Sequence, residues 1–312
     1  MNVAEKRLPQ DGGIRVKIAG KDVDIRVSTI PTAFGERVVL RLLDRGRVMI
    51  GLKDLGFSAE MLKLYERLIA RSNGIILITG PTGSGKTTTL YASLTHMNSS
   101  EKNILTVEEP IEYQLKGIGQ MQVNTKVGLT FARGLRHILR QDPDMIMVGE
   151  IRDRETAEIA IQAALTGHLV LSTLHTNDAA GAITRIIDMG IENFLVSSSL
   201  IAVMAQRLVR ILCHRCKEKY EPADEELALI GVRNYKSEVR SQGFYKKVGC
   251  DECLGTGYLG RIAIYELFEV DDEIRRLILH GGDSKSIKLE AEKRGMNSML
   301  ADGFSKVLQG IT

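Results

Sequence analysis

A glycine-rich segment carries the strongest chemical signal in the sequence. Residues 80–87 read Gly-Pro-Thr-Gly-Ser-Gly-Lys-Thr, which matches the phosphate-loop pattern G-x-x-x-x-G-K-[ST]. The apolar run 74–79 precedes it and predicts a buried strand, and a helical segment follows. Glycines let backbone N–H groups face phosphate oxygens, and the helix N-terminus adds partial positive charge. In such a loop Lys86 reaches the β- and γ-phosphates and Thr87 holds Mg²⁺. The sequence therefore predicts an ATP or GTP site built from Gly80, Pro81, Thr82, Gly83, Ser84, Gly85, Lys86, Thr87 and Thr88.

Three further apolar runs are each followed by polar side chains. Glu108 and Glu109 follow residues 103–107, and Glu150 follows residues 145–149. The third run, residues 168–173, begins at His168 and is followed by His175. In an open parallel sheet, ligands gather beyond the carboxyl ends of the strands. There an acid can orient water or hold hydrated Mg²⁺, and a histidine can contact the terminal phosphate. An acid after a strand can also be a solvated turn or cap, and a lone histidine can be structural. Both readings stay open for Glu109 and His175.

Arginines form a row on one face of a helix predicted over residues 131–140. Arg133, Arg136 and Arg140 share that face, opposite an apolar one. Cations near a helix C-terminus complement its dipole, which accounts for Arg140 better than for Arg133. Guanidinium groups beside a nucleotide site can instead meet a neighbouring subunit's acids or phosphate. The pattern does not decide between these readings.

All four cysteines lie in two C-x-x-C pairs. These pairs are Cys213 with Cys216 and Cys250 with Cys253. Such spacing is typical of a tetrahedral four-thiolate zinc site, although the insert here is longer than the common template. Free thiols or a redox pair are the alternatives. Four thiolates close the coordination shell, so a zinc ion here would be structural.

Composition excludes several classes of protein. The 312 residues are 44% hydrophobic and 26% charged, which is ordinary for a globular chain and excludes wholesale disorder. A net charge of +3, no tryptophan and 5% aromatic residues argue against a nucleic-acid surface. No apolar run approaches the ~20 residues that span a bilayer. The first residues lack an apolar signal core, so we expect a cytosolic protein.

Periodicity divides the chain into segments. Alternating apolar residues within 14–43 indicate strands, and an amphipathic helix is predicted over 59–70 with Ser58 as its cap. The tail is expected to be helical, with breaks at 281–282, Gly295 and Gly303. The expected domains are a small α/β segment at 1–46, a linker at 47–57, an ATPase core at 58–210, a zinc subdomain at 211–260 and a helical region at 261–312. The first segment is short for an independent domain, so we expect it to be a fragment of a larger one.

Together these motifs resemble the secretion ATPase superfamily, specifically the motors of type II secretion and type IV pilus assembly, over essentially the whole chain. Residues 80–87 resemble its Walker A motif, 106–113 its Asp box, 149–153 its Walker B motif and 166–177 its His box. The resemblance implies an α/β fold: a RecA-like P-loop ATPase domain preceded by a small α/β, PAS-like domain, with a tetracysteine zinc element and a helical tail. One departure is Glu109, where the family usually has Asp before the proline.

The resemblance also implies roles for individual residues. Glu150 would be the general base and Glu109 would help to order the attacking water. Arg26 and Arg41 of the small domain would reach the nucleotide at a subunit boundary. The remaining implied site or interface residues are Arg136, Arg140, Arg152, Arg185, Glu108, His168 and His175.

The function implied by the resemblance is that of a hexameric Mg-ATP-hydrolysing motor that drives pseudopilus assembly for type II secretion. Extension of a type IV pilus is the alternative within the family. The implied partners are further copies of the chain, an inner-membrane platform protein and a cytoplasmic docking protein, with peripheral association at the inner membrane. Two functions from other classes stay open: a nucleic-acid-dependent RecA-like translocase and a nucleotide-dependent assembly scaffold.

Overall fold

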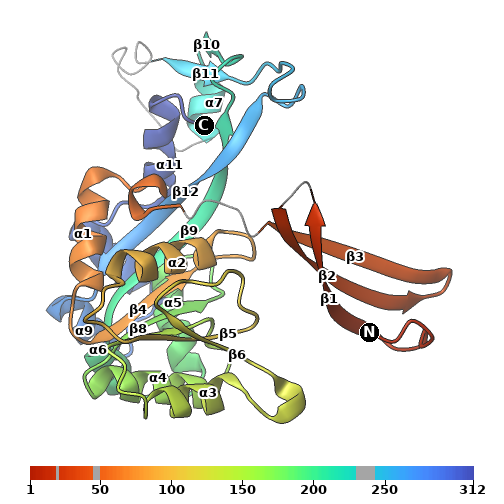
Figure 1. The fold of residues 1–312 in the computed structure, drawn as a ribbon. Coiled ribbons are helices and arrows are strands. Elements are labelled where there is room, and N and C mark those ends of the chain that lie inside the picture. The colour runs from red at the N-terminus through yellow and green to blue at the C-terminus, as the bar shows by residue number, and fades with distance from the viewer. Residues whose placement is uncertain (19–20, 45–49, 230–242) are drawn as a thin grey trace. The chain divides into compact units, whose positions relative to one another are not determined.

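The computed structural model describes residues 1–18, 21–44, 50–229 and 243–312 (Figure 1). These residues form two compact units. The first combines the described part of residues 1–49 with Ile111–Gln114, and the second combines Ile50–Pro110 with Leu115–Thr312. The second unit holds the phosphate loop and the cysteines.

The first unit contains an antiparallel sheet. Its strands are β1 (Gln10–Ile18), β2 (Lys21–Thr32) and β3 (Gly35–Asp44), in the order β1-β2-β3. The register places Ile25 opposite both Ile14 and Leu42, so the predicted alternation produces one apolar face. No helix lies among described residues 1–18 and 21–44, so this part of the expected α/β segment is a sheet alone. Period-two alternation leaves no 3.6-residue apolar stripe here that a helix could bury.

The second unit is built on a seven-stranded sheet in the order β12-β9-β4-β8-β7-β5-β6. The strands are β4 (Gly74–Thr79), β5 (Ile104–Glu108), β6 (Gly119–Gln122), β7 (Met145–Val148), β8 (Leu169–Leu174), β9 (Leu200–Leu212) and β12 (Tyr258–Glu269). All neighbours pair in parallel except β12, which runs antiparallel to β9. Every residue of β4 and β8 is buried, as the continuous apolar runs predict for central parallel strands.

Helices cover this sheet, with α2 on one side and α3 and α4 on the other in Figure 1. Side chains cap several of them, since Ser58, Thr130, Asp153 and Asp178 each accept a backbone N–H three residues ahead. The helices up to β9 are α1 (Ala59–Ile69), α2 (Lys86–Met97), α3 (Phe131–Ile138), α4 (Arg154–Leu165), α5 (Ala179–Asp188) and α6 (Asn193–Ser199), with short 3₁₀ turns at Leu52–Asp54 and Thr125–Val127.

The C-terminal region corrects one expectation. Residues 261–269, expected to begin a helical region, belong to β12 and extend the central sheet. This run is rich in the β-branched and aromatic residues that favour strands, and it pairs antiparallel with β9. The helices that follow are α9 (Asp272–Leu279), α10 (Ser284–Lys293) and α11 (Met299–Leu308). Gly303 lies inside α11 rather than at a break.

The two cysteine pairs lie at the two ends of the segment that connects β9 to β12. Cys213 follows the end of β9, and the second pair precedes β12. Between them, β10 (Glu218–Tyr220) pairs antiparallel with β11 (Phe244–Lys246), and α7 (Asp224–Leu229) follows β10. A membrane-crossing helix, long and apolar throughout, is not found in the part of the chain that the structure describes.

Candidate active site

The phosphate loop connects β4 to α2. Gly80, Gly83 and Gly85 have φ angles of 145°, 80° and 90°, a region that side chains disfavour. A Cβ at Gly80 would also lie 2.3 Å from the backbone oxygen of Gln206, so only glycine fits there. The loop is therefore shaped by both its own backbone and β9. Thr87 and Thr88 are exposed in the first turn of α2, where a helix favours anions.

Lys86 is the first residue of α2 and is largely buried. Its Nζ donates to the carbonyl oxygens of Gly80 at 2.7 Å and Pro81 at 3.2 Å. Burial lowers the pKa of Lys86, and the charge of Glu150 partly offsets this effect. The ammonium thus lies over the loop, close to where phosphate oxygens would compete with these carbonyls.

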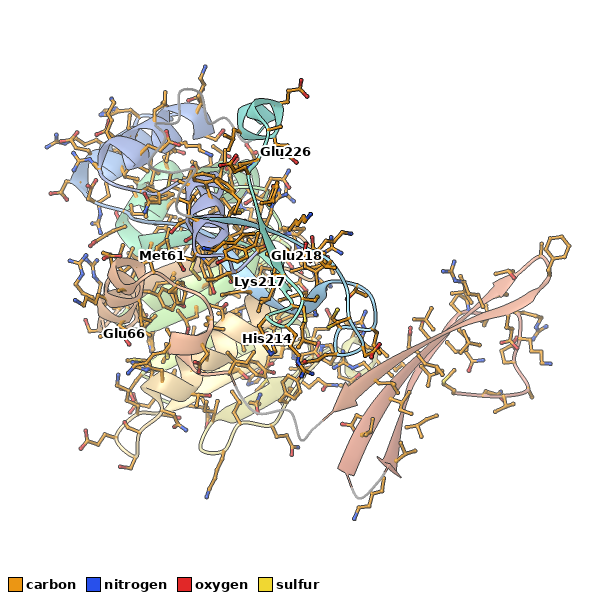
Figure 2. The ribbon with its side chains drawn as sticks, turned by 90° about the horizontal axis from the view of Figure 1, so that it is seen from above. Met61, Glu66, His214, Lys217, Glu218 and Glu226 are labelled. Atoms are coloured by element: carbon orange, nitrogen blue, oxygen red, sulfur yellow. The ribbon has the colours of Figure 1, made fainter. Side chains whose placement is uncertain are left out.

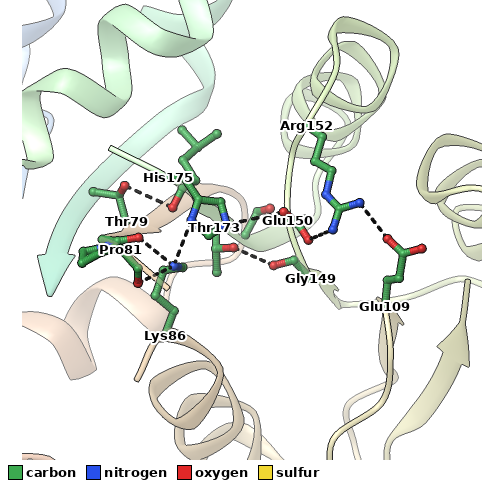
Figure 3. A network of polar contacts seen from close by, with 12 residues as sticks. Thr79, Pro81, Lys86, Glu109, Gly149, Glu150, Arg152, Thr173 and His175 are labelled. Atoms are coloured by element: carbon green, nitrogen blue, oxygen red, sulfur yellow. Dashed lines mark hydrogen bonds and ion pairs between the residues drawn. The ribbon is translucent and has the colours of Figure 1, made fainter. Parts of the chain in front are cut away.

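His175 connects Lys86 to Glu150 (Figure 3). Its Nδ1 lies 3.5 Å from Lys86 Nζ, and its Nε2 lies 3.5 Å from Glu150 Oε2. Nδ1 is thus the ring nitrogen that faces the ammonium, and Nε2 is the one that faces the carboxylate. Glu150 follows β7 and His175 follows β8, so neighbouring parallel strands deliver the two side chains to one edge.

Arg152 joins the two acids of the site. Its Nη1 lies 2.9 Å from Glu109 Oε2 and its Nη2 lies 2.5 Å from Glu150 Oε1 (Figure 3). Burial raises the pKa of Glu150, but the hydrogen bond and charge of Arg152, with the charges of His175 and Lys86, lower it by more. The carboxylate is therefore ionised at neutral pH and able to accept a proton.

Removing Arg152 tests this charge balance. We expect Arg152→Gln to raise the pKa of Glu150, because the largest contribution that lowers it is lost. A carboxylate base acts only when deprotonated, so the acidic limb of the pH–rate profile for ATP hydrolysis should move to higher pH. Arg154→Gln is the control, since Arg154 pairs with Glu158 outside the site. An acidic limb that does not move would contradict the assignment.

Glu108 and His168 do not join this network. Glu108 is buried, and it accepts hydrogen bonds from Tyr91, from Thr106 and, at 3.0 Å, from Gln120. Successive strand residues point to opposite faces, which separates Glu108 from Glu109. His168 precedes β8, whereas His175 follows it, and its Nδ1 contacts the carbonyl of Ala163 at 2.9 Å. The carboxylate of Glu108 is therefore engaged inside the core, and His168 lies at the opposite end of β8 from His175.

Arg136 and Arg140 have partners outside the phosphate loop. Arg136 of α3 pairs with Glu155 of α4 at 2.7 Å, and Arg140 donates to His137 Nδ1 at 2.6 Å. Arg185 is exposed on α5. Their exposure leaves them accessible at the surface of the second unit.

Arg26 and Arg41 lie directly opposite each other on β2 and β3. Like charges in that arrangement repel, so an anionic partner stabilises them. In the structure Glu112, which belongs to the same unit, pairs with Arg26 at 3.1 Å. Arg41 is exposed. The first unit thus presents two guanidinium groups on one face of its sheet.

Gln206 is a site residue that the sequence analysis missed. It lies in the middle of β9 and is 1% exposed. Its Nε2 donates to the carbonyl of Ser84 in the phosphate loop at 2.8 Å, and its Oε1 accepts from the hydroxyl of Thr89 at 2.8 Å. The available signal was an amide that interrupts the otherwise apolar start of this strand, from Leu200 to Ala205.

The four cysteine sulfurs converge to form a candidate metal centre. All four Sγ atoms lie within 4.8 Å of one another. The Sγ distances are 3.8 Å for Cys213–Cys250, 3.8 Å for Cys216–Cys253 and 3.7 Å for Cys250–Cys253. A tetrahedral zinc with Zn–S bonds of about 2.3 Å needs sulfurs about 3.8 Å apart, so the arrangement fits this ion.

Backbone donors favour a thiolate at Cys253. The N–H groups of Cys250 and Gly257 each lie 3.2 Å from the Sγ of Cys253. Burial raises the pKa of Cys253, but these donors and the neighbouring thiols lower it by more. In the sequence, His214 lies between the two cysteines of the first pair and Lys217 follows the second; both are labelled in Figure 2, and His214 is exposed. Zinc here would tie the connection after β9 to the segment before β12.

Metal content provides a direct test of this centre. We expect elemental analysis of the purified chain to find about one zinc per molecule. Cys250→Ser should lose the zinc and lower the melting temperature, because a structural zinc contributes directly to folding. His214→Gln should keep the metal, since its ring projects to solvent beside Glu252. Metal-free wild-type protein would contradict the zinc site.

Comparisons with known proteins agree with these features. The family model described as type II/IV secretion system protein matches residues 1–312. The chain is 58% identical over 312 residues to type II secretion system protein E of Pseudomonas aeruginosa, covering all of this chain and 61% of that protein. It is 52% identical over 312 residues to the type IV pilus assembly ATPase PilB of Thermus thermophilus, covering all of this chain and 35% of that protein.

A solved structure extends the likeness to the fold. The pilus retraction motor PilT, crystallised with ADP, superposes with a TM-score of 0.63 at 28% identity, over 95% of this chain and 77% of that one. The chain spans about three-fifths of the length of the type II relative named above. The resemblance drawn from the motifs is confirmed, and the chain belongs to the type II/IV secretion system protein family.

Proposed function

We propose that this chain forms the ATP-hydrolysing part of a hexameric motor that drives pseudopilus assembly for type II secretion. The observation that carries the proposal is the single sheet edge at which Lys86, His175, Glu150, Arg152 and Glu109 are connected beside the phosphate loop. This is the combination that phosphoryl transfer to water requires: a phosphate cradle, a carboxylate base and nearby cations.

The residues divide the chemistry between them. Lys86 leaves the carbonyls of the loop and pairs with the β- and γ-phosphates of ATP. Glu150 takes a proton from the attacking water as its oxygen bonds to the γ-phosphorus, and the bond to the β–γ bridging oxygen breaks. Glu109 helps to order that water, and Thr87 would hold Mg²⁺. A bound magnesium ion would neutralise charge on the phosphate oxygens.

Within the family, the type II relative supports the secretion assignment. Its identity of 58% exceeds the 52% of the pilus assembly ATPase PilB. The segments 34–44 and 197–201 also resemble the secretion branch more closely. Extension of a type IV pilus is the second candidate, and the PilB identity over the whole of this chain favours it.

The proposed partners follow the same reasoning. The motor would assemble from six copies and act in the cytoplasm, at the inner membrane. A membrane platform protein and a cytoplasmic docking protein would bind it there. The aromatic-poor composition and the net charge of +3 speak against nucleic acid as a partner.

Phosphate release from ATP by the purified chain tests the proposal. We expect Mg²⁺-dependent hydrolysis that neither DNA nor RNA stimulates. Hydrolysis that requires nucleic acid would contradict the secretion motor and favour the nucleic-acid-dependent translocase. Nucleotide binding without turnover, measured on oligomeric protein, would favour the assembly scaffold.

Arg26 tests the role of the first unit. We expect Arg26→Ala to bind ATP nearly as the wild type does but to hydrolyse it about a hundredfold more slowly or worse, because an arginine that stabilises the transferring phosphoryl group acts mainly in the transition state. Arg37→Ala on the neighbouring strand is the matched control. If assembled Arg26→Ala protein hydrolyses ATP at the wild-type steady-state rate, Arg26 does not take part in the reaction.

A further inference from the structure

Gln206 connects three elements of the second unit. It belongs to β9, its Nε2 donates to the carbonyl of Ser84, and its Oε1 accepts from the hydroxyl of Thr89 in α2. Both ends of the amide are thus engaged inside the core, where Gln206 is 1% exposed and Thr89 is fully buried. A buried amide with satisfied partners on both sides has one defined orientation.

The phosphate loop also packs tightly against this residue. A Cβ at Gly80 would lie 2.3 Å from the backbone oxygen of Gln206, and a Cβ at Gly85 would lie 2.8 Å from its Nε2. Gly80 and Gly85 therefore allow both the tight turn of the loop and its close contact with Gln206. The loop packs against β9 at these two glycines.

The contact with Ser84 fixes the direction of a backbone donor. In a planar trans peptide the C=O and the following N–H point in opposite directions. Because Gln206 holds the carbonyl of Ser84 toward β9, the N–H of Gly85 points away from β9. Gly85 is the last residue before α2, and its N–H is one of the groups that a phosphate loop offers to an anion.

We infer that Gln206 is a positioning residue for nucleotide binding: it holds the Ser84–Gly85 peptide so that its N–H faces the triphosphate, and Thr89 fixes the orientation of the Gln206 amide. This inference rests on the proposed nucleotide site. Gln206 acts through the loop, because its own polar atoms are used by Ser84 and Thr89. The loop is therefore ordered before nucleotide arrives, so that less ordering is required on binding.

Two near-isosteric substitutions test this role. Gln206→Met removes both hydrogen bonds while keeping the side-chain length, and Thr89→Val removes the donor to Gln206 together with a hydroxyl contact to Tyr265. We expect Gln206→Met to weaken binding of a fluorescent ATP analogue about tenfold, as expected when a buried hydrogen bond is lost. Thr89→Val should weaken it less, and the double variant should bind no worse than Gln206→Met, because Thr89 acts through the amide.

The control separates positioning from general stability. Thr156 is a buried threonine of α4 whose hydroxyl has no hydrogen-bond partner within the described ranges of the chain. Thr156→Val makes the same exchange as Thr89→Val and should leave nucleotide affinity unchanged. Melting temperatures are measured in parallel, and affinities are determined well below each transition.

The outcomes distinguish this inference from the proposed function. If the wild type does not bind the ATP analogue, the proposed function fails. If the wild type binds and folded Gln206→Met binds equally well, the positioning role fails while the proposed function stands. Should Gln206→Met not fold, Thr89→Val decides: affinity equal to that of Thr156→Val overturns the role, and weaker affinity supports it.

Discussion

Lys86→Ala is expected to reduce ATP hydrolysis at least about a hundredfold and to weaken nucleotide binding. The ammonium is the largest positive charge that the phosphate loop itself supplies, and it lies 2.7 Å from the carbonyl of Gly80 in the loop. Without it, the negative charge of the β- and γ-phosphates loses its main partner in both ground and transition states. Phosphate release and binding of a fluorescent ATP analogue measure the two effects.

A surface lysine provides the control for this change. Lys102 lies in the turn before β5 and is exposed, so Lys102→Ala should hydrolyse ATP at the wild-type rate. The melting temperature of the Lys86 variant shows whether it has folded. If folded Lys86→Ala protein retains wild-type turnover, residues 80–87 are not the catalytic phosphate loop.

Glu150→Gln is expected to separate binding from chemistry. The amide has nearly the same shape as the carboxylate, but it cannot accept the proton of the attacking water. Hydrolysis should therefore fall by about 10² to 10⁴, the contribution typical of a general base, while ATP binding persists. Single-turnover measurements with saturating nucleotide isolate the chemical step from binding and product release.

Glu109→Gln is the informative comparison, because both acids contact the same guanidinium. Glu150 lies closer to the phosphate loop through His175, and its side chain is 16% exposed against 34% for Glu109. We therefore expect the larger loss at Glu150. Glu158→Gln on α4, which is partly exposed and pairs with Arg154 outside the site, serves as the control. A larger loss for Glu109→Gln would reverse the two roles.

The sequence alone determined the features whose physics is local. The strand, glycine turn and helix of residues 74–97 follow from burial, backbone freedom and helix formation within one short segment. The C-x-x-C pairs likewise predict a four-sulfur site, and the structure brings the four Sγ atoms together. Parallel strands then explain why Glu109, Glu150 and His175 were expected at one edge.

Only the tertiary structure decided which neighbours these side chains meet. Arg152 bridges acids that follow different strands, and Gln206 reaches the phosphate loop from β9, more than a hundred residues along the chain. The strand β12 joins the central sheet by pairing with β9, a partner about fifty residues earlier in the chain. Such contacts depend on strand order and packing, which join distant segments, and a local pattern cannot specify a partner that it does not contain.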